Sequence, residues 1–206
     1  MSPSLRTVWI TVGTAFVLWF FTFALPVGNF WLKLTFSASL LAAVGLISSR
    51  GDLGALFFVR KMQIVVGILS ALVLYAVFAV GKELAGLLFS FAPGQIESVY
   101  ATKSQLDAVL IGLLLVFVMG PAEEIYWHGF VQRRLVARYG VKAGVLGTAA
   151  VYALVHAVSW NFMLVAAAGV CGLYWGILFQ REKSLVPLII SHSLWDVLIF
   201  VVFPMT

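Results

Sequence analysis

Long apolar stretches separated by short polar or glycine-containing segments make up most of the chain. A helix needs about 20 mostly apolar residues to cross the roughly 30 Å hydrocarbon core of a bilayer. The pattern therefore predicts an all-α polytopic bundle, a single transmembrane domain over residues 1–206 with about seven (six to eight) spans. The predicted spans are 8–25, 30–48, 63–81, 107–131, 143–159, 162–180 and 185–203.

Two connecting segments have patterns of their own. Residues 51–62 mix apolar and basic positions, which predicts a helix lying in the membrane interface, and residues 91–106 are expected to form an exposed loop. Within that loop, Ser104 and Asp107 have the spacing of a capping box, which predicts the start of the fourth span. We expect the first apolar run to be a retained helix, because it is longer than the core of a signal peptide.

Composition excludes an ordinary soluble fold. Of the 206 residues, 63% are hydrophobic and 10% charged, whereas globular chains average about 45–50% apolar and about 25% charged residues. The single cysteine, Cys171, lies inside an apolar run, which excludes a disulfide framework or a cysteine-rich zinc site. The net charge is +5, but the basic residues are scattered, so we expect no nucleic-acid partner.

The placement of the basic residues predicts the topology. With seven spans, three of the 13 Lys and Arg residues fall on one side of the membrane: Lys33, Lys82 and Lys103. The other side collects the remaining ten: Arg6, Arg50, Arg60, Lys61, Arg133, Arg134, Arg138, Lys142, Arg181 and Lys183. Because cytoplasmic segments carry an excess of Lys and Arg, this predicts a cytoplasmic N-terminus and a C-terminus on the opposite side.

Tryptophan and glycine positions add detail to this topology. Trp9, Trp31 and Trp160 fall at predicted span ends, where tryptophan commonly anchors a helix in the interface. Gly172 and Gly176 form a small-residue face on the sixth span, and such faces let helices approach closely.

The last four spans carry ionisable residues, which are rare inside a bilayer. Three unpaired carboxylates there would cost on the order of 8–10 kcal/mol on insertion scales, which approaches the stability of a typical domain. These groups must therefore face one another, a cavity or an ion. They comprise all three histidines of the protein and three acids: His128, His156, His192, Glu123, Glu124 and Asp196.

The depths and spacings of these residues indicate that they converge. At helical rise, Glu123, His156 and His192 lie about 15, 21 and 14 Å from the predicted cytoplasmic boundary. Gly120-Pro121 directly precedes the glutamates, and the proline is expected to kink the helix beside a water-accessible pocket. Spacing of four residues places three pairs on shared helix faces: Glu124 with His128, Tyr152 with His156, and His192 with Asp196.

Three motifs follow one another on these spans: Glu123-Glu124-Ile-Tyr-Trp-His128, Tyr152-Ala-Leu-Val-His156 and His192-Ser-Leu-Trp-Asp196. Over about residues 107–200 they resemble the CPBP (Abi) family of intramembrane proteases, which includes CAAX-processing endopeptidases and bacterial proteins linked to bacteriocin processing and immunity. His128 stands where the family usually has arginine. The resemblance implies an endopeptidase that cleaves a membrane-associated, CAAX-like or peptide substrate in the bilayer.

Two versions of the chemistry stay open. In the metal-free version, Glu123 is the general base on a water held by His156, and His192 donates to the oxyanion. In the other version, Glu123, His156 and His192 are three ligands of a zinc ion, with Asp196 orienting a histidine. We expect the pocket to lie between the fourth, fifth and seventh spans and to open toward the cytoplasm.

The remaining residues of the motifs are assigned supporting roles. Successive helix positions point about 100° apart, so Glu123 and Glu124 cannot both aim at one water. Following the family motif, Glu123 is the base, while Glu124 pairs with His128, and Tyr152 supports the site. Two other classes stay open, namely a catalytically inactive membrane interaction or immunity-type protein and a proton- or ion-coupled transporter. Transporters usually have two related halves, whereas here the polar residues occupy one half.

Overall fold

The computed structural model describes residues 5–205, which contain helices and no strand. Six helical stretches are long and apolar enough to cross a membrane, and the seventh, Val186–Val202, is shorter. This confirms the predicted all-α polytopic bundle, and each predicted span has its counterpart. The six long stretches are Leu5–Phe23, Phe30–Leu56, Lys61–Leu88, Ala108–Tyr139, Val141–Ser159 and Phe162–Glu182.

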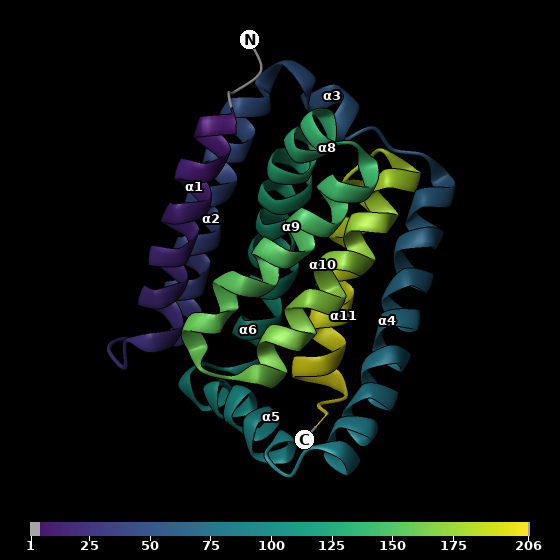
Figure 1. Cartoon of the computed structure of the whole chain (residues 1–206). Coiled ribbons are helices and arrows are strands. Elements are labelled where there is room, and N and C mark those ends of the chain that lie inside the picture. The colour runs from purple at the N-terminus through teal and green to yellow at the C-terminus, as the bar shows by residue number, and fades with distance from the viewer. Residues whose placement is uncertain (1–4, 206) are drawn as a thin grey trace.

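The α-helices are numbered along the chain, and short π or 3-10 segments join several of them into longer spans. Their bounds are α1 Leu5–Trp19, α2 Phe30–Ser49, α3 Leu53–Leu56, α4 Lys61–Leu88, α5 Ala92–Tyr100, α6 Ala108–Leu114, α7 Gly120–Glu124, α8 Arg133–Tyr139, α9 Val141–Val155, α10 Phe162–Glu182 and α11 Val186–Val197. In Figure 1, α1 and α2 lie at one edge of the bundle and α4 at the other. Helix α11 packs against α4, and α10 packs against α9.

The two ends of the bundle differ. Helix α1 begins at the end where α3 lies, and the described chain finishes at the opposite end, which α5 covers (Figure 1). This arrangement agrees with an odd number of crossings. The end at which α1 begins carries the larger group of ten Lys and Arg residues and is named the basic end of the bundle; there Arg133 Nη2 donates to Asp52 Oδ2 at 2.8 Å. Which end faces the cytoplasm stays a prediction from charge.

The fourth span passes through the predicted Gly120-Pro121 break as one helical stretch with π-helical turns. A π segment, Leu115–Met119, directly precedes α7, and a second one, Ile125–Gln132, follows it. Proline cannot donate a helical hydrogen bond, and the wider π turns change the pattern of bonds on either side of it. A Cβ atom on Gly120 would lie 2.5 Å from Ser193 Oγ, so glycine permits the close approach of α11.

The segment between the third and fourth spans differs from the expected exposed loop. It forms α5 and a 3-10 turn, Ala101–Gln105. Asn161 Nδ2 donates to the carbonyl of Gln95 at 2.7 Å, which ties α5 to the start of α10. The capping-box prediction was also wrong in detail, because Asp107 itself caps α6 while Ser104 Oγ donates to Ala101 within its own turn. Contacts such as this one, with a residue 66 positions later in the chain, hold the segment against the bundle.

Two interface predictions need correction. The interfacial helix expected over 51–62 is reduced to the single turn of α3, and α4 already begins at Lys61. Trp31 is buried, with its Nε1 donating to the carbonyl of Thr102 at 2.9 Å, because the 3-10 turn after α5 folds over it. Trp9 and Trp160 are exposed, as expected for anchors.

Close packing of α4 on α11 depends on Gly67. A Cβ atom there would lie 2.8 Å from Ile190 Cβ and 2.9 Å from the carbonyl oxygen of Pro187. We expect Gly67→Ala to lower the free energy of unfolding by about 1–3 kcal/mol through overpacking, measured by denaturant unfolding in detergent micelles. Gly86→Ala, on the same helix in open space, is the control and should be neutral or stabilising by up to about 1 kcal/mol. Equal effects of the two variants would contradict this account.

Candidate active site

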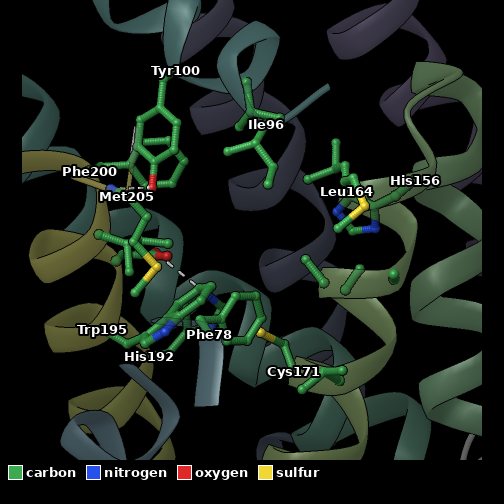
Figure 2. A pocket seen from close by; sticks show the side chains of 18 of the residues that line it. Phe78, Ile96, Tyr100, His156, Leu164, Cys171, His192, Trp195, Phe200 and Met205 are labelled. Atoms are coloured by element: carbon green, nitrogen blue, oxygen red, sulfur yellow. Dashed lines mark hydrogen bonds and ion pairs between the residues drawn. The ribbon is translucent and has the colours of Figure 1, made fainter. Parts of the chain in front are cut away.

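Most of the predicted site residues line one cavity of about 390 Å³ inside the bundle. The fourth span contributes Glu123, the fifth contributes Tyr152 and His156, and the seventh contributes His192 and Asp196. Figure 2 shows His156 on one wall, facing His192 and Trp195 across the cavity. Glu124 and His128 are also buried, but they do not line the cavity. The structure thus brings together the segments that the sequence predicted to converge.

Glu123 is the glutamate that borders the cavity. Its Oε2 accepts a hydrogen bond from the Tyr152 hydroxyl at 2.6 Å, which joins the fourth and fifth spans. Gly172 makes room for this tyrosine, since a Cβ atom there would lie 2.9 Å from Tyr152 Cδ1. The small-residue face predicted on the sixth span therefore positions the hydroxyl that contacts Glu123.

Glu124 bridges two histidines. Its Oε1 lies 2.7 Å from His192 Nδ1, and its Oε2 lies 2.7 Å from His128 Nδ1. The side chain of Glu124 is only 1% exposed, so an unpaired charge there would be strongly destabilising. The predicted pair with His128 is present, and the second partner, from α11, is one that sequence spacing did not indicate.

His192 is oriented by Glu124 rather than by Asp196. The distance from His192 Nε2 to Asp196 Oδ2 is 3.5 Å, longer than an ordinary N–H···O hydrogen bond. The predicted orienting role of Asp196 is therefore not seen, because Glu124 approaches the ring from another span more closely than the carboxylate four residues away. Trp175 also fixes the ring, stacking on it with centroids 3.8 Å apart.

A chain of hydroxyl groups holds Trp175 in place. Its Nε1 donates to Ser191 Oγ at 3.1 Å, and Ser191 Oγ lies 3.0 Å from Ser70 Oγ on α4. Ser70 also bonds the Tyr174 hydroxyl. The sequence analysis did not identify these residues, because serine and tryptophan within apolar spans have no distinctive spacing.

His156 makes hydrogen bonds through both ring nitrogens. Its Nδ1 lies 2.8 Å from the carbonyl oxygen of Tyr152, and its Nε2 lies 3.1 Å from Trp19 Nε1. An indole N–H only donates, so Nε2 is the acceptor and Nδ1 carries the proton. A water or a metal ion at Nε2 would have to replace Trp19. The aromatic residue on α1 is a second member of the site that the sequence analysis missed.

The donor groups do not form the ligand set that the zinc version requires. Among residues 5–205, no group of three or more His, Cys, Asp or Glu side chains is arranged to hold a metal ion. Of the three predicted ligands, His156 directs Nε2 at Trp19, and His192 directs Nδ1 at Glu124. The side chains therefore do not fit the predicted metal site, and no step below involves a metal.

The remainder of the cavity is mostly apolar and leads away from the basic end. Beyond the ionisable groups its wall consists largely of aromatic and aliphatic side chains, including Phe78, Trp195 and Phe200. It extends to α5 through Ile96 and Tyr100. The cavity thus extends toward the α5 end of the bundle, and its opening toward the cytoplasm stays a prediction.

Comparison with known proteins places a family match over this region. Residues 103–198 match the family model described as Type II CAAX prenyl endopeptidase Rce1-like. The match covers 96 of the 206 residues and includes all six ionisable residues of the motifs, but neither Trp19 nor Ser70. Searches of curated proteins and of solved structures found no match.

The bond between Trp19 and His156 can be tested against a matched tryptophan. Trp19→Phe leaves His156 Nε2 as a buried acceptor without its donor, which costs about 1–3 kcal/mol. Trp127 is equally buried and packs against Trp19, but its Nε1 has no hydrogen-bond partner. We expect Trp19→Phe to lower the unfolding free energy by about 1–3 kcal/mol more than Trp127→Phe does.

Nitrogen NMR of histidine-labelled protein provides a second measurement for the same pair of variants. The His156 ring should show the Nδ1-protonated form in the wild type, and its Nε2 resonance should move in Trp19→Phe but not in Trp127→Phe. The same Nε2 shift in both variants would show that packing rather than the hydrogen bond sets the state of the ring.

Proposed function

We propose that this multi-pass membrane protein is an intramembrane endopeptidase in which Glu123 activates water. Its residues 103–198 match the model of the Rce1-like type II CAAX prenyl endopeptidases, which supports a membrane protease. One observation carries the proposal: of the two adjacent glutamates, Glu123 borders the cavity, whereas Glu124 is enclosed between two histidines. The substrate is a peptide or the tail of a membrane-associated protein.

The first step is attack by water on the scissile carbonyl. Glu123 takes a proton from a water molecule in the cavity, and the oxygen of that water forms a bond to the carbonyl carbon. The hydrogen bond from Tyr152 positions the carboxylate. The carbonyl π electrons move onto oxygen, which becomes the oxyanion of a tetrahedral intermediate. Glu123 then gives its proton to the amide nitrogen as the C–N bond breaks, which regenerates the carboxylate.

His192 is the proposed donor to the oxyanion. Its Nδ1 is engaged with Glu124, and in the proposed mechanism the ring is also protonated at Nε2, so that Nε2–H can donate toward the cavity. Stacking on Trp175 fixes the plane of the ring, and such preorganised donors are among the largest contributions to catalysis. Asp196 lies on the Nε2 side and completes the polar end of the cavity.

His156 is assigned a positioning role rather than the water-holding role expected from the motif. Through Nδ1 it bonds the backbone carbonyl of Tyr152, and through Nε2 it is held by Trp19. It therefore orders the end of the fifth span, from which the Tyr152 hydroxyl reaches Glu123. His128 supports the site indirectly, through its contact with Glu124.

We expect Glu123→Gln to lower kcat/KM by about 10²–10⁴-fold, the usual contribution of a general base. The assay uses purified protein in detergent and a quenched fluorescent peptide ending in a farnesylated CAAX sequence, the substrate class named in the family description. Glu83→Gln, at an exposed position on α4, is the matched control and should retain wild-type turnover. Turnover by Glu123→Gln within about twofold of wild type would reject this assignment.

A chelator should leave the wild-type rate unchanged, and loss of activity in chelator would overturn the metal-free mechanism.

The two glutamates should differ in their effect on stability. Glutamine at position 123 still accepts from the Tyr152 hydroxyl, so thermal unfolding should change little. Glutamine at position 124 removes the charge between two buried histidines, and breaking a buried pair costs about 3–5 kcal/mol. Thermal unfolding of both variants in detergent checks this, and equal stability would argue against the bridging role of Glu124.

A further inference from the structure

The hydroxyl group of Tyr152 lies directly beside the glutamate proposed as the base. Tyr152 belongs to α9 and lines the same cavity as Glu123. Its hydroxyl donates to Glu123 Oε2 at 2.6 Å, and the residue is buried. Because this bond occupies Oε2, the attacking water is left to Oε1 of the same carboxylate. The water, and the carbonyl group that it attacks, would therefore lie close to the Tyr152 hydroxyl.

Three ring nitrogens on the cavity wall are less suited to stabilise an oxyanion. Trp175 Nε1 already donates to a serine hydroxyl, and His156 Nδ1 is bonded to a backbone carbonyl. Trp195 Nε1 has no hydrogen-bond partner, but the atom itself is buried. The proposed mechanism assigns one donor, His192, to the oxyanion, and this oxygen has lone pairs for a second. Tyr152 carries a hydroxyl that already touches the reacting groups.

The movement of charge during the attack decides which acceptor this hydroxyl prefers. Before the attack, Glu123 carries the negative charge. Once Glu123 has taken the proton of the water, the carboxyl group is neutral and the former carbonyl oxygen is charged. Hydrogen bonds to an ionised acceptor are about twice as strong as those to a neutral one, and a hydroxyl can rotate its hydrogen while the ring stays in place. The favoured acceptor therefore changes from Glu123 to the oxyanion.

We propose that Tyr152 is a catalytic donor whose hydroxyl leaves Glu123 as the water loses its proton and then stabilises the oxyanion together with His192. This inference rests on the proposed function. Tyr152 keeps its own proton throughout, because the water proton goes to Glu123 and from there to the amide nitrogen as the C–N bond breaks. The hydroxyl then returns to Glu123 Oε2. An interaction that forms only as the oxyanion develops raises kcat without tightening substrate binding.

The first test removes the hydroxyl alone. With the farnesylated CAAX peptide in detergent, Tyr152→Phe should lower kcat by about 10²–10³-fold, the usual effect of losing one oxyanion donor, and should leave KM within about twofold of wild type. Tyr126→Phe is the matched control, because Tyr126 is equally enclosed in the bundle but does not line the cavity. Equal kcat values for the two variants would overturn the proposal.

A transition-state analogue distinguishes a donor to the oxyanion from a residue that only positions the base. The probe is the same peptide with a phosphinate in place of the scissile amide, and its affinity is measured by fluorescence anisotropy. The measurement uses Glu123→Gln protein, in which no base acts. Adding Tyr152→Phe should weaken binding of the phosphinate by about tenfold or more and leave binding of the uncleaved peptide unchanged. Unchanged phosphinate affinity would show that Tyr152 acts only through Glu123.

A second variant moves the ring but keeps its hydroxyl. A Cβ atom on Gly172 would lie 2.9 Å from Tyr152 Cδ1, so Gly172→Ala displaces the tyrosine. Gly169→Ala, on the same helix, is the control, since its Cβ atom would lie at an ordinary 3.6 Å from Ala153 Cβ. We expect only Gly172→Ala to lower kcat and phosphinate affinity, each by about tenfold or more. Equal values for the two variants would contradict the role of the hydroxyl.

Failure of this inference and failure of the proposed function give different results. Cleavage that is lost in Glu123→Gln but kept in Tyr152→Phe would reject the role of Tyr152 and leave the protease intact. A wild-type protein that neither cleaves the CAAX peptide nor binds the phosphinate would reject the proposed function, and the inference with it.

Discussion

The structure depends on one buried carboxylate being compensated by two imidazoles. Glu124 is enclosed in the bundle, where an uncompensated charge is strongly unfavourable, and it contacts His128 on its own span and His192 on α11. Gly120 permits the required approach of α11. Because adjacent helix positions point about 100° apart, fixing Glu124 toward α11 leaves Glu123 facing the cavity. Contacts of one carboxylate thus set both the packing of two spans and the direction of the glutamate proposed as the base.

The first hundred residues contribute to the site although they carry none of the motifs. Trp19 donates to His156, and Ser70 supports the serine that holds Trp175 against His192. Residues 103–198 match the family model, but Trp19 of α1 bonds one motif histidine, and Ser70 of α4 supports the tryptophan that stacks on another. The N-terminal half is therefore more than a membrane anchor, since its side chains fix the rings on which the proposed chemistry depends.

The position of His128, where the motif that the chain resembles has arginine, can be compared with its surroundings. A guanidinium carries a permanent charge, whereas an imidazole can be neutral or charged. In this chain Glu124 has a second imidazole partner, His192, at the same distance of 2.7 Å. Two histidines thus contact one carboxylate. His128, four residues after Glu124, makes its contact within the same span.

The sequence by itself determined the helical bundle, its six long apolar helices with a shorter seventh, and the set of ionisable residues in the last four of these helices, because apolar length and helical spacing are local properties. It also indicated the pair of Glu124 and His128, which lie one turn apart. Only the tertiary structure decided that Glu124 rather than Asp196 orients His192, that Trp19 bonds His156, that α5 closes one end, and that the cavity leads away from the basic end. Those outcomes depend on how distant helices rotate and pack against one another, and a linear pattern does not contain that information.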